Sequence, residues 1–260
     1  VLDLTGGTGN VGLGSGSLGT AMTTGTNNVA VGENALDAFT TGSDNVAVGD
    51  AAAGVLTTGS NNVAIGTNAL DANTTGGSNV AIGLDALGGN TTADSNIAIG
   101  RGALYVNTTG ADNVSVGRGS LAANTTASNN TAIGRSALAA NTTGTQNTAL
   151  GMDTLKAATT ASNNVALGYA AMQSTTTGGN NIGIGYAALD ADTTGTHNVA
   201  VGFNALTAQT AADYNTAVGG SALSSSTTGA RNTAVGYSVA NSITTGNRNV
   251  AMGYNALGAE

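Results

Sequence analysis

Asn28-Val29-Ala30-Val31-Gly32 is the five-residue phrase that decides the fold, because it recurs every 17 residues without a slip through Asn249. An earlier copy begins at Asn10, 18 residues upstream of Asn28, so one residue is inserted there. A repeat this short cannot bury its own apolar face, and such repeats stack into a solenoid. The sequence therefore predicts about fifteen stacked coils.

The repeats occupy almost the whole chain of 260 residues. We expect residues 1–9 to form an N-terminal lead-in and residues 10–260 to form a single solenoid array, with an incomplete last coil. The chain begins with Val1, and the last coil stops at Glu260 without a polar cap. We therefore expect the chain to be part of a longer protein.

The local pattern predicts an all-β parallel β-solenoid. The repeated phrase is short, rich in β-branched residues and closed by glycine, which is typical of a strand that ends at a bend. The Ala-Leu pair that follows predicts a second short strand or an extended corner, since six residues are too few for a stable helix. Thr-Thr-Gly then turns the chain into the next coil. The Asn that opens each coil is expected to form a ladder of amide hydrogen bonds.

The two faces of the predicted strand differ in side-chain size, and successive side chains point to opposite faces. The second and fourth residues of the phrase, such as Val63 and Ile65, are mostly aliphatic, so we expect them to face a dry interior. The third residue is never large, which we interpret as a face packed against a neighbouring chain. This predicted inter-chain packing row comprises Ala30, Ala47, Ala64, Ala81, Ala98, Ser115, Ala132, Ala149, Ala166, Gly183, Ala200, Ala217, Ala234 and Ala251.

A single thin solenoid has little apolar area to bury. The chain contains only two Phe and six Tyr, against a backbone ordering cost of about 1–2 kcal/mol per residue. Because closed symmetry is the usual solution for self-association, we expect a homotrimer in which three chains, intertwined or side by side, share one core.

Composition excludes several functions. Six Lys plus Arg and a net charge of −8 cannot build a continuous phosphate track, so we expect no nucleic-acid partner. No run of about 18 apolar residues is present, so we expect no direct membrane insertion. One His and no Cys argue against His-dependent nucleophilic triads and structural zinc sites. We therefore expect no enzyme activity, no metal and no cofactor.

The position after the bend glycine is the best candidate for a functional surface. It passes from acidic residues through three Arg to a run of aromatics. Arg rows suit anionic glycans and exposed aromatic rings suit stacking on sugars; alternatively, the aromatics stack on one another and seal the corner of the coil. The candidate receptor- or glycan-contact row comprises Arg101, Arg118, Arg135, Tyr169, Tyr186, Phe203, Tyr237 and Tyr254.

Other motifs are interpreted as parts of the repeat. The G-x-G-x-x-G match at residues 7–12 lacks a surrounding βαβ unit, so it is the start of the first coil rather than a nucleotide site. His197 is expected in a solvated loop. Three acidic residues share one repeat position and are either weak cation ligands or solvated carboxylates: Asp37, Asp71 and Asp190. The Asn residues that precede Thr-Thr match the N-glycosylation pattern as a by-product of the repeat: Asn73, Asn90, Asn107, Asn124 and Asn141.

The phrases at residues 62–66 (N-V-A-I-G) and 130–134 (N-T-A-I-G) resemble the head repeats of YadA-like trimeric autotransporter adhesins. The period is longer here, and the 17-residue unit looks closer to the N-T-A-I-G-x-x-A-L-x-x-N-T-T-G repeats of phage tail-fibre-like proteins. The resemblance implies a trimeric extracellular fibre on a phage tail or bacterial surface, which presents or forms a region that binds a host glycan or protein receptor.

The Thr-Thr pairs favour one alternative function, an ice-binding β-solenoid with a regular Thr face. Adjacent Thr residues of a strand point to opposite faces, so only one of the two Thr columns can face outward. The T-x-T spacing that would give two outward columns does not recur from coil to coil and is found only in isolated coils, as at Thr143-Gly144-Thr145. An enzyme is the third alternative, and it would require a pair of acids in a groove.

Overall fold

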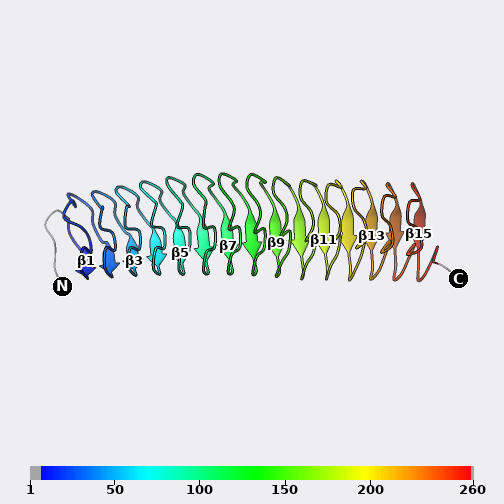
Figure 1. The fold of residues 1–260 in the computed structure, drawn as a ribbon, viewed down its shortest axis with the longest axis horizontal. Helices are drawn as coiled ribbons and strands as arrows, with labels where there is room; N and C mark the ends of the chain where they lie inside the picture. The colour runs from blue at the N-terminus through cyan, green and yellow to red at the C-terminus, as the bar shows by residue number, and fades with distance from the viewer. Residues whose placement is uncertain (1–6, 259–260) are drawn as a thin grey trace. The chain divides into compact units, whose positions relative to one another are not determined.

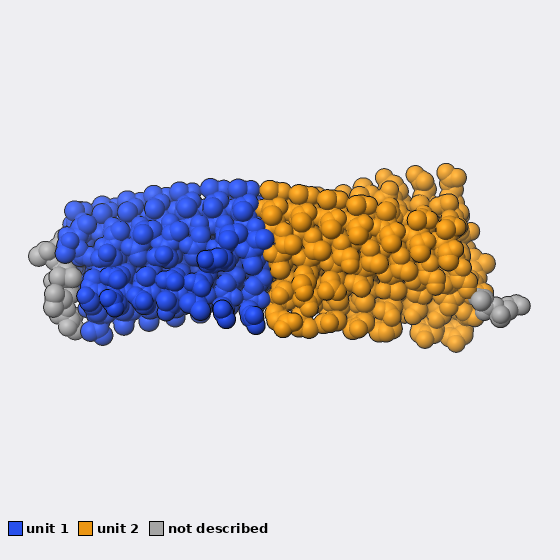
Figure 2. All heavy atoms as spheres, viewed as in Figure 1, with its two compact units in different colours: residues 1–129 blue, residues 130–260 orange. Residues whose placement is uncertain are grey.

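The computed structural model describes residues 7–258, which form two compact units divided after Asn129, unit 1 (described residues 7–129) and unit 2 (described residues 130–258) (Figure 2). The described residues contain no helix and fifteen strands of three residues each. Residues 1–6 of the predicted lead-in lie outside the described part. The strands of unit 1 are β1 (Val11–Leu13), β2 (Val29–Val31), β3 (Val46–Val48), β4 (Val63–Ile65), β5 (Val80–Ile82), β6 (Ile97–Ile99) and β7 (Val114–Val116). Those of unit 2 are β8 (Thr131–Ile133), β9 (Thr148–Leu150), β10 (Val165–Leu167), β11 (Ile182–Ile184), β12 (Val199–Val201), β13 (Thr216–Val218), β14 (Thr233–Val235) and β15 (Val250–Met252).

Within each unit, every strand pairs in parallel with the strand of the next coil (Figure 1). The register follows the repeat, so that Val29 pairs with Val46 and Ala30 with Ala47. The inserted residue before Asn28 is absorbed outside the strand, because Val11 still pairs with Val29. The predicted all-β parallel solenoid with a 17-residue period is confirmed, and each coil contributes one strand.

The bend glycine is required where each strand ends. Gly49 has a φ of 137°, and a Cβ atom at this position would lie 2.7 Å from the carbonyl carbon of Gly66 in the next coil. Both the dihedral angle and the close approach of the stacked backbones exclude a side chain.

The Ala-Leu segment forms neither the second strand nor the extended corner that the sequence predicts. In the coil after β2, Asn34 and Leu36 have φ values of 54° and 53°, in the left-handed region. Their amides still bond to adjacent coils, with Asn34 N donating to Ser15 O at 2.8 Å and Leu36 N donating to Ala52 O at 3.1 Å. Left-handed residues at alternate positions curl the chain into turns, which carries each Leu side chain into the interior.

The strand faces are reversed relative to the sequence prediction. The small third residues of the phrase, from Ala30 to Ala251, lie inside the coil of their own chain, and Ala98 is 0% exposed. The aliphatic second and fourth residues face outward, with burial alternating exposed, buried, exposed along β6. The row of small residues is therefore not available to pack against a neighbouring chain.

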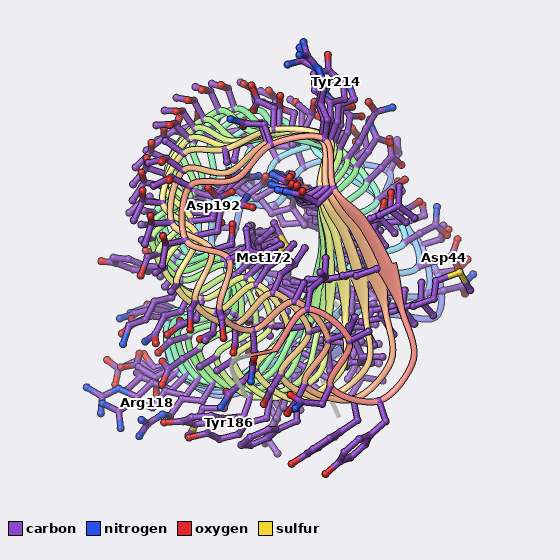
Figure 3. All side chains as sticks on the ribbon, turned by 90° about the vertical axis from the view of Figure 1, so that its right-hand side faces the viewer. Asp44, Arg118, Met172, Tyr186, Asp192 and Tyr214 are labelled. Carbon is purple, nitrogen blue, oxygen red and sulfur yellow. The ribbon has the colours of Figure 1, made fainter. Side chains whose placement is uncertain are left out.

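Space inside the coil explains this reversal. A Cβ atom added at Gly183 would lie 2.7 Å from Cγ of Met172, and one added at Gly12 would lie 3.0 Å from Cδ1 of Leu18. These long side chains occupy the Leu position of the turn and point into the interior, as Met172 does in Figure 3. The close neighbour that keeps the third residue small belongs to the same chain.

Two ladders of buried Asn side chains complete the core. In the ladder that opens each coil, Asn45 donates from Nδ2 to Oδ1 of Asn28 at 3.0 Å, which confirms the sequence prediction. A second ladder lies inside unit 1, where Asn90 donates to Oδ1 of Asn73 at 3.0 Å and Asn107 donates to Oδ1 of Asn90 at 3.0 Å. Because the second ladder is buried, its members are structural parts of the repeat and not accessible glycosylation acceptors.

Candidate binding surfaces

The aromatic residues of the candidate contact row form stacked columns on the outside of unit 2. Tyr169 stacks on Tyr186 and Tyr186 stacks on Phe203, each pair with ring centroids 5.4 Å apart. Tyr237 stacks on Tyr254 at 5.8 Å. All five rings are at least 45% exposed. The rings therefore cover one another's faces, as one of the two interpretations predicts, while their edges remain open to solvent.

The arginines of the same row are also exposed, and they point away from the coil, as Arg118 does in Figure 3. Arg101 and Arg118 line one hollow on unit 1, and Arg135 is exposed on unit 2. Among residues 7–258, the three form no ion pair with a carboxylate. Their guanidinium groups are thus free to bind an anion.

A pair of hollows flanks Tyr105 on unit 1, a residue outside the candidate row predicted from the sequence. One hollow has a volume of about 320 Å³ and is lined by Asp71, Asp85 and Gly88, among others. The other has a volume of about 280 Å³ and includes Asp85, Arg101 and Arg118. Aligning the coils by repeat position reveals the signal, because Tyr105 is the one aromatic at a position otherwise held by small, polar or charged residues.

A second outward column on unit 2 combines an imidazole, a phenol and a guanidinium. His197 stacks on Tyr214 with centroids 5.0 Å apart, and Cζ of Arg231 lies 5.6 Å from the Tyr214 ring centroid. Tyr214 points outward in Figure 3. His197 is an exposed turn residue with a φ of 58°, which confirms its predicted place in a loop.

The Thr-Thr pairs divide into two columns with different roles. The first Thr of each pair bonds to the next coil, as when Oγ1 of Thr57 donates to the carbonyl of Thr74 at 2.9 Å. The second, such as Thr58 or Thr75, is exposed. Only one Thr column is therefore free to contact solvent or ice, as the sequence predicts.

The acidic residues do not converge on a cation site. Among the described residues, no group of three or more His, Asp or Glu side chains lies close enough to hold a metal ion. Asp37 is exposed, whereas burial raises the pKa of Asp71 and of Asp190. Of the two interpretations of these carboxylates, solvation fits Asp37, while the other two are partly withdrawn from water.

Asp192 carries a carboxyl group into the interior of unit 2 (Figure 3). Desolvation raises its pKa to about 7, although the bond from the Gly195 amide and the neighbouring polar side chain of Gln209 lower it, and the charge of Asp213 raises it further. Oδ1 accepts from Gly195 N at 3.1 Å, while Oδ2 is buried without a hydrogen-bond partner. Asp192 is therefore a core residue with perturbed ionisation.

The fold and these surfaces define a parallel β-solenoid that displays its chemistry as columns of repeated positions. No helix in the described part of the chain is long and apolar enough to cross a membrane. Comparison of the chain with protein-family models, with curated proteins and with solved structures finds no match.

Proposed function

We propose that this chain is a non-enzymatic structural segment of an extracellular fibre, on a phage tail or a bacterial surface, which assembles as a homotrimer and presents or forms a receptor-binding region. The observation that carries the proposal is the outward face of the strands. It is aliphatic in every coil of unit 1, and in unit 2 it is interrupted by Thr at the first position of β8, β9, β13 and β14, although it faces solvent in the single chain. A regular solenoid with an apolar strip and few charges is suited to side-by-side association.

The strip consists of two columns of side chains, one from the first residue and one from the third residue of each strand. Ile97 and Ile99 of β6 are 37% and 36% exposed, and Val165 and Leu167 of β10 are each 40% exposed. A spacing of about 4.8 Å between strands makes the strip about 34 Å long on unit 1 and about 38 Å long on unit 2. With a width of about 10 Å, each unit exposes roughly 350 Å², at the scale of the largest apolar patch on a typical monomer.

Association would remove this strip from water. Each unit exposes roughly 350 Å² of it, and in a homotrimer this area would be divided between the two neighbouring chains. In a homotrimer, the strips of three chains would face a common axis and form the shared core that the composition predicts. The aliphatic strip thus takes the role that the sequence analysis assigned to the row of small residues.

Light scattering tests the assembly. We expect a solution mass of three times 24.8 kDa for the wild-type chain. The double variant Ile97→Lys, Ile99→Lys places two charges on the strip and should lower the mass toward 24.8 kDa. The control Thr92→Lys, Thr109→Lys adds the same charge at exposed positions of the Thr column and should remain trimeric. A wild-type chain that is monomeric at every concentration would contradict the proposal.

The exposed Thr column supports a second candidate function, ice binding. It provides a regular row of hydroxyl and methyl groups on unit 1 at Thr41, Thr58, Thr75, Thr92 and Thr109. Thermal hysteresis that disappears when Thr58 and Thr75 are replaced by Lys would establish this function. A wild-type chain that leaves the freezing point and the shape of ice crystals unchanged would eliminate it.

A further inference from the structure

We infer that the two hollows around Tyr105 form a binding site for one acidic residue of a saccharide, such as a hexuronic acid. The inference rests on the proposed function, because it names the ligand class of the fibre surface. It concerns unit 1 alone and uses residues of four consecutive coils. Asp71, Asp85, Tyr105 and Arg118 come from four different repeats that the solenoid brings side by side.

Several glycines that depart from the repeat sequence lie close together around Tyr105. Gly88 stands where most other coils carry a side chain and lines the first hollow, where a Cβ atom would lie 3.4 Å from Cε2 of Tyr105. Gly102 and Gly119 stand at a left-handed position that other coils fill with residues such as Asn68, and a Cβ atom at either would meet nothing within 4 Å. The missing side chains leave open the space on both sides of the Tyr105 ring.

The ring of Tyr105 supplies an apolar surface between the polar linings of the two hollows. Tyr105 is 48% exposed and lines both hollows. The C–H faces of a sugar ring pack on such an aromatic face, while the sugar hydroxyls bond to polar groups at its rim. A volume of about 320 Å³ lies at the small end of ligand pockets, which suits a single sugar residue rather than a long chain.

The first hollow offers acceptors for sugar hydroxyl groups. Asp71 and Asp85 line it together with Asn68, and Nδ2 of Asn68 donates to Oδ1 of Asp85 at 3.2 Å. This bond orients the Asp85 carboxylate and offsets part of its charge. Carboxylate oxygens accept hydroxyl hydrogens in charge-assisted bonds, which are stronger than neutral ones.

The second hollow selects for an anionic group. Arg101 and Arg118 line it together with Asp85, so the two guanidinium groups outnumber the one carboxylate, and neither forms an ion pair within residues 7–258. They are two of only six Lys plus Arg in a chain of net charge −8, so the rest of the surface attracts anions poorly. The planar guanidinium binds a carboxylate through two parallel bonds. The acidic group of the sugar would therefore point toward Arg101 and Arg118, and its hydroxyls toward Asp71.

Calorimetric titration with trigalacturonate, and with neutral galactotriose as the control ligand, tests the inference. We expect trigalacturonate to bind and to weaken as salt is raised, because the anion is held by exposed charges. Galactotriose should bind at least about tenfold more weakly, corresponding to loss of the charge-assisted bonds. Equal affinity for the two ligands, or no binding of trigalacturonate, would overturn the inference.

The repeat itself supplies variants that keep the fold. Tyr105→Ala copies Ala122, Gly88→Gln copies Gln173, and Arg101→Thr copies Thr67 at the same repeat positions. Each should reduce the affinity for trigalacturonate about tenfold or more, because it removes the ring, fills the first hollow or removes a cation. Tyr214→Ala serves as a control with an equally exposed aromatic. Binding that survives all three site variants would place the ligand elsewhere and contradict the inference.

Light scattering on the same samples separates this inference from the proposed function. A trimer that does not bind trigalacturonate would contradict the saccharide site but not the proposed assembly. A monomer that binds trigalacturonate through Tyr105 would contradict the proposed assembly but not the saccharide site.

Discussion

The carboxyl group of Asp192 occupies a repeat position that holds Asn in several coils of unit 1, including Asn73 and Asn90. An amide can donate and accept in this interior, whereas a carboxylate must lose its hydration to lie there. Burial therefore raises the pKa of Asp192 to about 7, and the side chain is protonated in the folded chain under mildly acidic conditions.

This pKa predicts how stability depends on pH. Between about pH 4, the pKa in the unfolded chain, and about pH 7, the folded chain binds one more proton than the unfolded chain. The free energy of unfolding therefore falls as pH rises through this range, by roughly 4 kcal/mol in total from Asp192. Urea denaturation at pH 4, 5.5, 7 and 8 measures this fall.

Asp192→Asn isolates the contribution of this one carboxyl, because burial raises the pKa of Asp71 and Asp190 in both proteins. The variant should be more stable than the wild type at pH 8 and should show a smaller fall between pH 4 and pH 7. Identical pH profiles for the two proteins would show that Asp192 does not titrate in this range.

At the scale of the structural element, the coil depends on buried amides that satisfy backbone carbonyls. Nδ2 of Asn45 donates to the carbonyl of Gly59 at 2.9 Å, and Oδ1 of Asn45 accepts from Asn62 N at 3.0 Å. Nδ2 of Asn62 likewise donates to the carbonyl of Gly76 at 2.9 Å, but that carbonyl has a second donor in Nδ2 of Asn73 at 2.8 Å.

Replacement of Asn45 and of Asn62 should therefore lower the free energy of unfolding by different amounts. Asn45→Ala leaves the Gly59 carbonyl and the Asn62 amide without these bonds, and we expect a loss of about 3 kcal/mol or more in the free energy of unfolding. Asn62→Ala should cost about 1 kcal/mol less, because Asn73 still bonds to Gly76. Urea denaturation measures both, with exposed Thr41→Ala as a control expected to change stability by less than about 0.5 kcal/mol. Equal losses at the two Asn positions would argue against this role of the second ladder.

Much of the coil could be predicted from the sequence because its determinants are local. The β-branched phrase predicts the strand, the glycine predicts the bend, and the period predicts the parallel register. The orientation of the strand could not be predicted, since alternation separates two faces without saying which is inside. That depends on where the turn sends Leu36 and its equivalents, and the left-handed φ of these residues has no strong signature in a Leu side chain.

The candidate sites also differ in whether they could be predicted from the sequence. The exposed Arg and aromatic columns could be predicted, because stacking brings residues 17 positions apart together. The site at Tyr105 depends on what its neighbours lack, notably at Gly88 and Gly102. A search for repeated residues overlooks it, because its members are exceptions to the repeat and come from different positions within it.

At the scale of the whole molecule, a solenoid consists of coils that contact mainly their nearest neighbours, so stability and surface chemistry are sums over coils. The interior of each coil is filled by its own Leu and Ala side chains, so no partner is required to keep Ala98 dry. What a partner would bury is the outward aliphatic strip. The reversal of the strand faces thus changes which surface would associate in the proposed trimer, and the apolar area available to a partner is larger than a row of small residues would provide.

Thiol labelling tests this central claim most directly, because the chain has no Cys of its own. Three single variants place a thiol on the strip (Ile97→Cys), in the interior (Ala98→Cys) and on the exposed Thr column (Thr92→Cys). We expect Cys at position 92 to react at every protein concentration, Cys at position 98 to react only in denaturant, and Cys at position 97 to become protected as concentration rises and the trimer forms. A thiol at position 97 that reacts as fast as the one at position 92 at all concentrations, or a freely reactive thiol at position 98, would contradict the account.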